Sequence, residues 1–218
     1  FDNQQKQPRY IGKAKNLRRR IAYYLKAGGK ASQILKSSHF LKINPTDSEI
    51  EALLLEADLI KVFQPKFNVR QKDDRSFLYL VIRYSDFPYL EVVREKNLNL
   101  KNKDKVFGPF VDSVSLKEAL KALRQIFPFR DCKPSQFQKA QKNKHPCLYY
   151  HLDKCLAPCL GKISKRRYQN MIQELISFLK IKKDLLVKKW QREMKEAALR
   201  QQFEKAKILR DRLRALER

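Results

Sequence analysis

Four cysteines lie close together in this sequence, in a segment rich in lysine, arginine and proline. Intervals of 14, 7 and 3 residues separate Cys132, Cys147, Cys155 and Cys159. Four thiolates can bind Zn²⁺ or an iron–sulfur cluster, and nearby lysines favour the thiolate form. The intervals match neither the paired CxxC motifs of a zinc ribbon nor the ferredoxin pattern. The residues alone leave zinc and iron–sulfur open, with disulfides or unligated thiols as the weaker alternative.

Glu56 is a second candidate for metal chemistry because of its surroundings on a predicted helix. Its neighbours three and four positions away are all apolar: Ala52, Leu53, Leu59 and Ile60. A carboxylate on an apolar face is destabilising unless it is paired or coordinated. A hard divalent cation would satisfy it while needing few protein ligands. An ion pair with Arg20 or Lys13 is the alternative, and the residues alone do not separate the two.

Basic and phenolic side chains gather on another predicted helix, over residues 13–26. Its apolar stripe, which we expect to be buried, consists of Ala14, Leu17, Ile21 and Leu25. A helical wheel places Lys13, Arg20 and Tyr24 together at the border of that stripe. An arginine fork, an ammonium and a phenol could grip a phosphate group. A solvated basic face is the alternative that the residues leave open.

The elements that must position these groups follow from periodicity and end signals. Strands are predicted at 9–11, 77–83, 89–94 and 106–110, the second and third from a period of two. Helices are predicted at 13–26, 31–40, 49–63, 116–126 and from 164 to the end. Ser48 and Glu51 form a capping box before the third helix. A shift of the apolar stripe near Gln201 divides the last helical stretch into a hairpin.

The composition predicts a polyanionic partner. The 218 residues include 49 Lys and Arg against 23 Asp and Glu, a net charge of +26. Nucleic acid is the commonest partner of such a charge, and solubility alone needs much less. No apolar run approaches the roughly 20 residues that cross a bilayer. No signal-like segment is visible, so we expect a cytoplasmic protein without a membrane partner, whose thiols are not paired as disulfides.

Four segments resemble parts of a known family. RYIGKAKNLRRRIAYYL resembles the second half of the GIY-YIG nuclease motif, and LLLEADLIKVFQPKFNVR resembles its glutamate helix and following asparagine. FPFRDC and HPCLYYHLDKCLAPCLG resemble the cysteine segment of the UvrC family of bacterial nucleotide excision repair nucleases. MKEAALRQQFEKAKILRDRL resembles the family's UVR motif. Together these segments extend the resemblance over nearly the whole chain.

The resemblance implies an α+β fold with a small antiparallel sheet flanked by helices, and cleavage of DNA with one Mg²⁺ or Mn²⁺. Positions that match the family's functional residues are Tyr10, Gly12, Lys13, Arg20, Tyr24, Glu56 and Asn68. By this match Glu56 binds the metal, Tyr10 activates the attacking water, and Lys13 and Arg20 orient the scissile phosphate. Gly12 allows DNA to approach closely, and the asparagine orders the site by hydrogen bonding.

For the cysteines, the resemblance implies a [4Fe–4S] cluster, with Zn²⁺ as the alternative. For the C-terminal hairpin it implies binding to UvrB, with Phe203 near the hairpin tip as the contact residue. A contact of Phe203 inside the hairpin is the alternative.

We therefore predict the N-terminal part of a UvrC-family endonuclease that makes the 3′ incision beside a lesion in damaged double-stranded DNA. The predicted domains are a nuclease domain at 1–72, an α+β connection at 73–131, the cysteine segment at 132–162 and a helical region at 163–218, with the hairpin at about 183–218. The family's first strand, with another tyrosine, is expected before Phe1, so we expect this chain alone to be an incomplete nuclease. The alternative function is a non-enzymatic adaptor that binds DNA and UvrB and carries a vestigial nuclease site.

Overall fold

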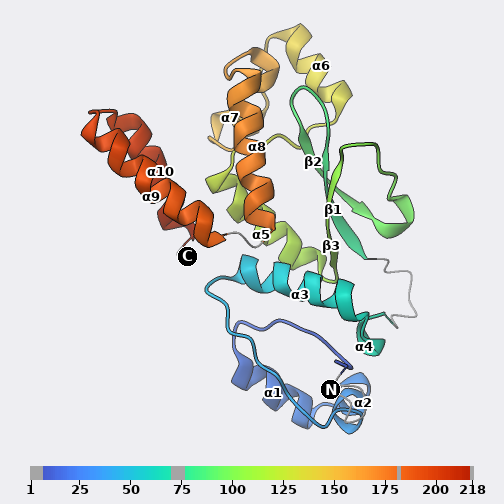
Figure 1. Ribbon diagram of the computed structural model, residues 1–218. Coiled ribbons are helices and arrows are strands. Elements are labelled where there is room, and N and C mark those ends of the chain that lie inside the picture. Colours follow the sequence, from blue (N-terminus) through green and yellow to red (C-terminus); the bar gives the residue numbers. More distant parts are fainter. Residues whose placement is uncertain (1–6, 70–76, 181–182, 217–218) are drawn as a thin grey trace.

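The computed structural model describes residues 7–69, 77–180 and 183–216. Its helices and strands are α1 (Leu17–Lys26), α2 (Lys30–Lys36), α3 (Glu49–Phe63), α4 (Lys66–Val69), β1 (Leu78–Arg83), β2 (Tyr89–Arg94), β3 (Lys105–Phe110), α5 (Ser113–Ile126), α6 (Pro134–Asn143), α7 (Leu148–His151), α8 (Lys165–Leu179), α9 (Lys183–Leu199) and α10 (Phe203–Leu216). Short 3₁₀ helices are η1 (Glu95–Asn97) and η2 (Pro158–Leu160). The predicted α+β class is confirmed (Figure 1).

The sheet is antiparallel, with strand order β2-β1-β3. Its strands lie where the sequence predicts them. The central strand β1 is buried on both faces at Leu80, Val81 and Ile82, whereas β2 buries only Leu90. Leu80 of the central strand pairs with Val92 on one side and Phe107 on the other. The whole sheet belongs to the middle of the chain, and helix α3 from the N-terminal part lies against β3 (Figure 1).

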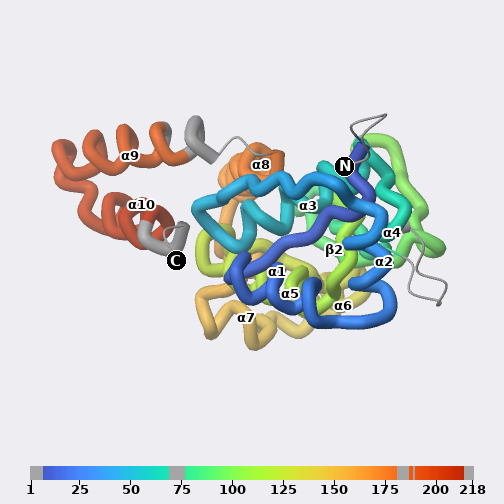
Figure 2. Tube along the Cα trace, turned by 90° about the horizontal axis from the view of Figure 1, so that it is seen from below, coloured from blue at the N-terminus to red at the C-terminus, as the bar shows by residue number. Residues whose placement is uncertain are grey.

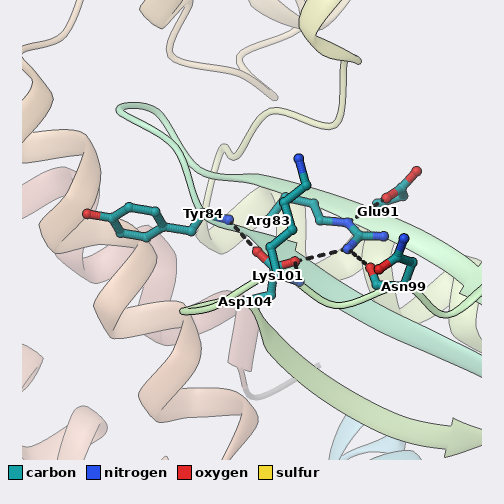
Figure 3. Close-up of polar contacts among 6 residues, drawn as sticks. All are labelled: Arg83, Tyr84, Glu91, Asn99, Lys101 and Asp104. Carbon is teal, nitrogen blue, oxygen red and sulfur yellow. Dashed lines mark hydrogen bonds and ion pairs between the residues drawn. The ribbon is translucent and has the colours of Figure 1, made fainter.

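An ion-pair network lies at the end of β1, around Arg83 and Asp104 (Figure 3). Arg83 at the end of β1 contacts Glu91 at 2.8 Å and Asp104 at 2.9 Å. The Asp104 carboxylate also accepts the backbone N–H of Tyr84 at 2.9 Å. These bonds satisfy a carboxylate whose side chain is only 2% exposed, and they tie the loop before β3 to the β1–β2 hairpin.

The strand predicted at 9–11 is wrong. Residue 9 is in a bend, and residues 9–11 form no strand and join no sheet within the described ranges. The Asn68 side chain takes the place of a partner strand: its Oδ1 accepts the N–H of Ile11 at 2.9 Å, and its Nδ2 donates to the Ile11 carbonyl at 2.8 Å. The backbone of Arg9 is bound by the N–H of Phe67 at 3.1 Å. A side-chain amide cannot be recognised as a strand partner from local sequence.

The first helix begins later than predicted, at Leu17, because Asn16 is its N-cap and accepts the N–H of Arg19 at 3.0 Å. Lys13 therefore lies in the preceding loop and not on the helical wheel. The expected burial of the apolar stripe is also wrong: α1 contains no buried residue, and Leu25 is 69% exposed. The second helix likewise ends early, at Lys36.

The third helix is capped as predicted. The Ser48 hydroxyl accepts the N–H of Glu51 at 3.2 Å, while the Glu51 carboxylate accepts the N–H of Asp47 at 3.1 Å. The helix ends at Phe63, and its C-cap Gln64, just before Pro65, has a left-handed φ of 44°. These two ends fix the register of α3 and therefore the position of Glu56.

The main core lies between the sheet and helices α3, α5 and α8. Its members include Leu53, Leu80, Phe110, Leu123 and Leu175, each at most 3% exposed. Burial of each such apolar side chain contributes about 1.5–3 kcal/mol to the free energy of folding, and together these contributions hold the elements in place. Because α3 shares this core, the N-terminal segment is joined to the middle of the chain by packing as well as by sequence.

The C-terminal helices form the predicted hairpin, which projects from one side of the molecule in both views (Figures 1 and 2). Its turn falls at Gln201, whose φ of 57° is left-handed. Trp190 of α9 is fully buried and its ring lies 5.5 Å from that of Phe127. Arg212 of α10 pairs with Glu174 of α8 at 3.5 Å. Across residues 7–69, 77–180 and 183–216, no helix has the length and apolar content to cross a membrane.

Candidate active site and cysteine segment

Two phenols and one guanidinium meet at the N-terminal end of the molecule. Arg20 and Tyr24 are one turn apart on α1, and Tyr10 comes from the loop before it. Nη2 of Arg20 donates to the hydroxyls of both tyrosines, at 3.3 Å each. The two rings lie 5.8 Å apart. Since an arginine has five N–H donors, the guanidinium can hold both phenols and still bind an anionic oxygen.

Gly12 is required by the position of the Tyr10 ring. A Cβ at residue 12 would lie 2.7 Å from the Tyr10 hydroxyl oxygen and 2.8 Å from its Cε1. Any larger residue would therefore push the phenol out of its place beside Arg20.

Glu56 faces this group from α3. Its Oε1 accepts the backbone N–H of Lys13 at 3.1 Å. Burial raises the pKa of Glu56, and the hydrogen bond and charge of Lys13 oppose that rise only in part. The ion pair with Lys13 or Arg20 that the sequence left open is not formed, and the second carboxylate oxygen accepts no hydrogen bond within the described part of the chain.

The Lys13 side chain is held by the middle of the chain. Its Nζ donates to the Ser115 hydroxyl at 2.6 Å, and that hydroxyl donates in turn to the Asp112 carboxylate. Asp112 caps α5 by accepting the N–H groups of Val114 and Ser115. Burial opposes ionisation of Asp112, but the bonds from Ser115 and Val114 outweigh it and lower its pKa.

The structure thus brings together all seven predicted residues of this site. Asn68, 4% exposed, contributes by fixing the backbone of Ile11 next to Tyr10. Sequence reasoning missed Ser115 and Asp112. Their Asp-x-x-Ser pattern signals a helix N-cap, but nothing local connects it to a lysine 102 positions earlier.

All four cysteines are free thiols, and Cys132 and Cys155 lie in loops. Cys147 is the N-cap of α7 and Cys159 lies in η2. Burial raises the pKa of Cys155 to about 12, with the other three cysteines adding to the rise. Burial raises the pKa of Cys132 as well, again with a contribution from neighbouring cysteines. Their thiolates would therefore repel one another, so a positive group is needed to hold them ionised.

The donor set of this segment is four thiols. In the ranges that the structure describes, no three or more His, Cys, Asp or Glu side chains form a group that could hold one ion. The cysteines nevertheless influence one another's ionisation, and four thiolates are the donor set of a tetrathiolate zinc site or of an iron–sulfur cluster.

Two buried arginines frame the cysteine segment. Arg124 of α5 lies 4.5 Å from the Phe129 ring and 4.2 Å from the Tyr149 ring, and it pairs with Asp131. Arg130 lies 4.8 Å from the Tyr89 ring and 4.1 Å from the ring of Phe137 on α6. Sequence reasoning missed both, because in this chain arginine is too common to stand out.

Comparisons with known proteins agree along the chain. The family model described as UvrC-like GIY-YIG domain matches residues 1–69, the UvrC/Cho excinuclease middle domain matches 77–178, and the UvrB/uvrC motif matches 184–218. The chain belongs to the UvrC family.

Curated relatives support this UvrC-family assignment. The UvrABC system protein C of Rickettsia felis is 41% identical over 97% of this chain and 32% of its own length. That of Carboxydothermus hydrogenoformans is 40% identical over 96% of this chain and 34% of its own length. The chain thus spans about a third of the length of these relatives. No solved structure matches it.

The matched UvrC-family segments divide the functional groups between them. The GIY-YIG match contains the seven residues gathered around Arg20, and the middle-domain match contains all four cysteines. The third match covers α9 and α10. The Lys13–Ser115 hydrogen bond therefore joins the first matched segment to the second.

Proposed function

We propose that this chain carries the metal-dependent endonuclease site of a nucleotide excision repair protein. The observation that supports this most is the half-buried Glu56 carboxylate, which accepts the Lys13 N–H and is under the charges of Lys13 and Arg20, with one oxygen lacking a hydrogen-bond donor in the described residues. Such a carboxylate needs a cation, and the adjacent cationic side chains suit a phosphate. The family match and the net charge of +26 favour DNA as the polyanion.

Glu56 would hold Mg²⁺ or Mn²⁺, which when bound supplies Lewis-acid stabilisation of charge on a phosphate oxygen. Arg20 would orient the scissile phosphate through its remaining donors. Tyr10 would take the proton of the attacking water. Burial raises the pKa of Tyr24, and its neighbour Tyr10 adds to the rise, so Tyr24 stays protonated and acts as a donor. The two phenols therefore have different roles.

We further propose that the 3′ incision beside a lesion is the reaction, and that UvrB recruits the protein through the α9–α10 hairpin. Large apolar side chains cover the tip: Leu199 is 85% exposed and Phe203 69% exposed. Neither is needed by the hairpin's own packing, which uses Trp190 and Leu209. An exposed apolar tip of this kind is typical of a docking site.

The cysteine segment would bind a [4Fe–4S] cluster with a structural role. Four free thiols that influence one another's ionisation support a tetrathiolate site, and the resemblance of this segment to the UvrC family favours iron–sulfur over Zn²⁺. Iron and acid-labile sulfide measured on anaerobically prepared protein test this assignment. Zinc in place of iron would contradict it.

Nicking of a lesion-containing duplex tests the nuclease proposal. The chain, extended at its N-terminus by the strand expected there, is assayed with UvrB and Mg²⁺. Glu56→Ala should abolish nicking, and Asp58→Asn, an exposed acidic position on the same helix, should not. Nicking that survives Glu56→Ala removes the metal-ligand assignment. Absence of nicking with the unsubstituted protein favours the non-enzymatic adaptor.

A further inference from the structure

Arg130 is a buried cation without an anionic partner among the residues that the structure describes. Its residue is 4% exposed, and its Nε is buried without a hydrogen-bond acceptor. Within the described ranges no carboxylate pairs with its guanidinium, which lies between the rings of Tyr89, at 4.8 Å, and Phe137, at 4.1 Å. Ring contacts recover only part of the free energy that a buried charge loses by leaving water. An anion is therefore missing from its surroundings.

The neighbouring Arg124 shows how this fold otherwise satisfies such a group. Arg124 is 7% exposed, donates to the Phe129 carbonyl at 3.2 Å and pairs with Asp131. Since Asp131 is committed to Arg124, the nearest carboxylate in sequence does not serve Arg130.

The charge of Arg130 acts instead on the cysteines. Arg130 precedes Cys132 by two residues. Its guanidinium lies on the ring of Phe137 of α6, and α6 packs against η2, the element that contains Cys159. In this position its charge favours the anionic forms of Cys132 and Cys159. Its charge also acts on the Tyr168 hydroxyl, but burial raises the pKa of Tyr168, so this phenol stays neutral. The thiolates of the cysteine segment are therefore anions that this cation can serve.

Hydrogen bonds fix Arg130 in this position. Its backbone N–H donates to the Tyr168 hydroxyl on α8 at 3.0 Å. Its carbonyl accepts the N–H of Leu90 on β2 at 3.1 Å. The residue is therefore tied to two elements of the main core, and its side chain cannot relax into solvent by a movement of the loop.

We propose that Arg130 is the counter-cation of the group bound by the four cysteines, a positioning residue that makes burial of their thiolates possible. The inference rests on the proposed iron–sulfur cluster. A cluster with four thiolate ligands carries net negative charge, so the buried guanidinium is compensated when the cluster is present and uncompensated when it is absent. Residues beyond the direct ligands commonly change metal retention in this way.

Release of the cluster to an iron chelator measures the effect. Anaerobically prepared chain is compared with Arg130→Met, Arg130→Gln and Arg130→Lys by the half-life of the cluster's visible absorbance. The two uncharged variants should lose the cluster about ten-fold faster or more, and Arg130→Lys should stay closer to the unsubstituted chain. Lys133→Gln, which removes an exposed cation near Cys132, is the matched control and should change nothing.

A second measurement separates this role from a purely structural one. Arg130→Met keeps the apolar stem between the two rings, so in the cluster-free protein it should melt at the same temperature as the unsubstituted chain or higher. In the loaded protein it should melt lower. A structural role predicts a fall in both states.

The failures can be told apart. If the unsubstituted chain contains no iron and sulfide, the cluster proposal fails and this inference with it. If it contains the cluster and the uncharged variants release it at the unsubstituted rate, the role of Arg130 is refuted while the cluster stands. If Arg130→Met does not fold, Arg130→Gln and Arg130→Lys still provide the comparison of charge.

Discussion

Substitution of Tyr168 by phenylalanine tests how the cysteine segment is joined to the core. The Tyr168 hydroxyl donates to the Pro88 carbonyl at 3.0 Å and accepts the Arg130 N–H at 3.0 Å, and the residue is 0% exposed. Tyr168→Phe removes one oxygen and leaves two buried backbone groups without partners. The ring remains, together with its edge contact to Phe87 at 5.7 Å.

The expected loss follows from these two bonds. A buried group left without its partner costs about 1–3 kcal/mol, so two of them give roughly 2–6 kcal/mol. Small backbone shifts recover part of this, and we expect the free energy of unfolding to fall by about 2–4 kcal/mol. Urea unfolding followed by circular dichroism measures the change.

Tyr84→Phe provides the matched control, because Tyr84 is 59% exposed and points away from the network that binds its backbone (Figure 3). It should change the free energy of unfolding by no more than about 0.5 kcal/mol. If Tyr168→Phe behaves like this control, the Tyr168 hydroxyl does not join α8 to the cysteine segment, and the argument that Arg130 is held in place fails.

Other substitutions test the candidate site and the hairpin. Gly12→Ala should displace the Tyr10 phenol, whose oxygen lies 2.7 Å from the added carbon, and should reduce nicking while the circular dichroism spectrum stays unchanged. Burial raises the pKa of Glu56, so folding favours its protonated form, and the stability that this form provides is lost as pH rises through the folded pKa. Glu56→Gln, which cannot ionise, should therefore raise the melting temperature of the metal-free protein at neutral pH. The gain in melting temperature should vanish at acidic pH. Phe203→Ala should weaken UvrB capture without changing the melting temperature, since the side chain is 69% exposed.

The parts of the fold that sequence predicts are those fixed by local signals. The strands β1 and β2 follow from a sequence period of two, and α3 begins where Ser48 binds the N–H of Glu51. The segment at 9–11 was wrongly predicted as a strand because the hydrogen-bond partner of Ile11 is the Asn68 side chain, 57 residues away in sequence. The apolar stripe of α1 was wrongly predicted to be buried. An apolar pattern shows which face of a helix is suited to burial, but it does not show whether another element covers that face.

The candidate site was predictable by a different route. Resemblance to a family identified the seven residues around Arg20, and the fold then brought them together. The contacts that complete the site were not predictable, because Lys13 reaches Ser115 across 102 residues of sequence. Arg130 could not be distinguished among the 49 basic residues until its burial without an anion was visible.

These long-range contacts make the nuclease site depend on the middle of the chain. Lys13 contacts Glu56 through its backbone and Ser115 through its side chain, so α3 and α5 together determine where its charge lies. The same α5 presents Arg124 to the cysteine segment at its other end. One helix therefore joins Lys13, which we propose orients a phosphate, to the proposed cluster. A shift of α5 on loss of the cluster would move the Ser115 hydroxyl and, with it, the Lys13 ammonium. In this way a structural cluster would affect the position of Lys13 without contacting it.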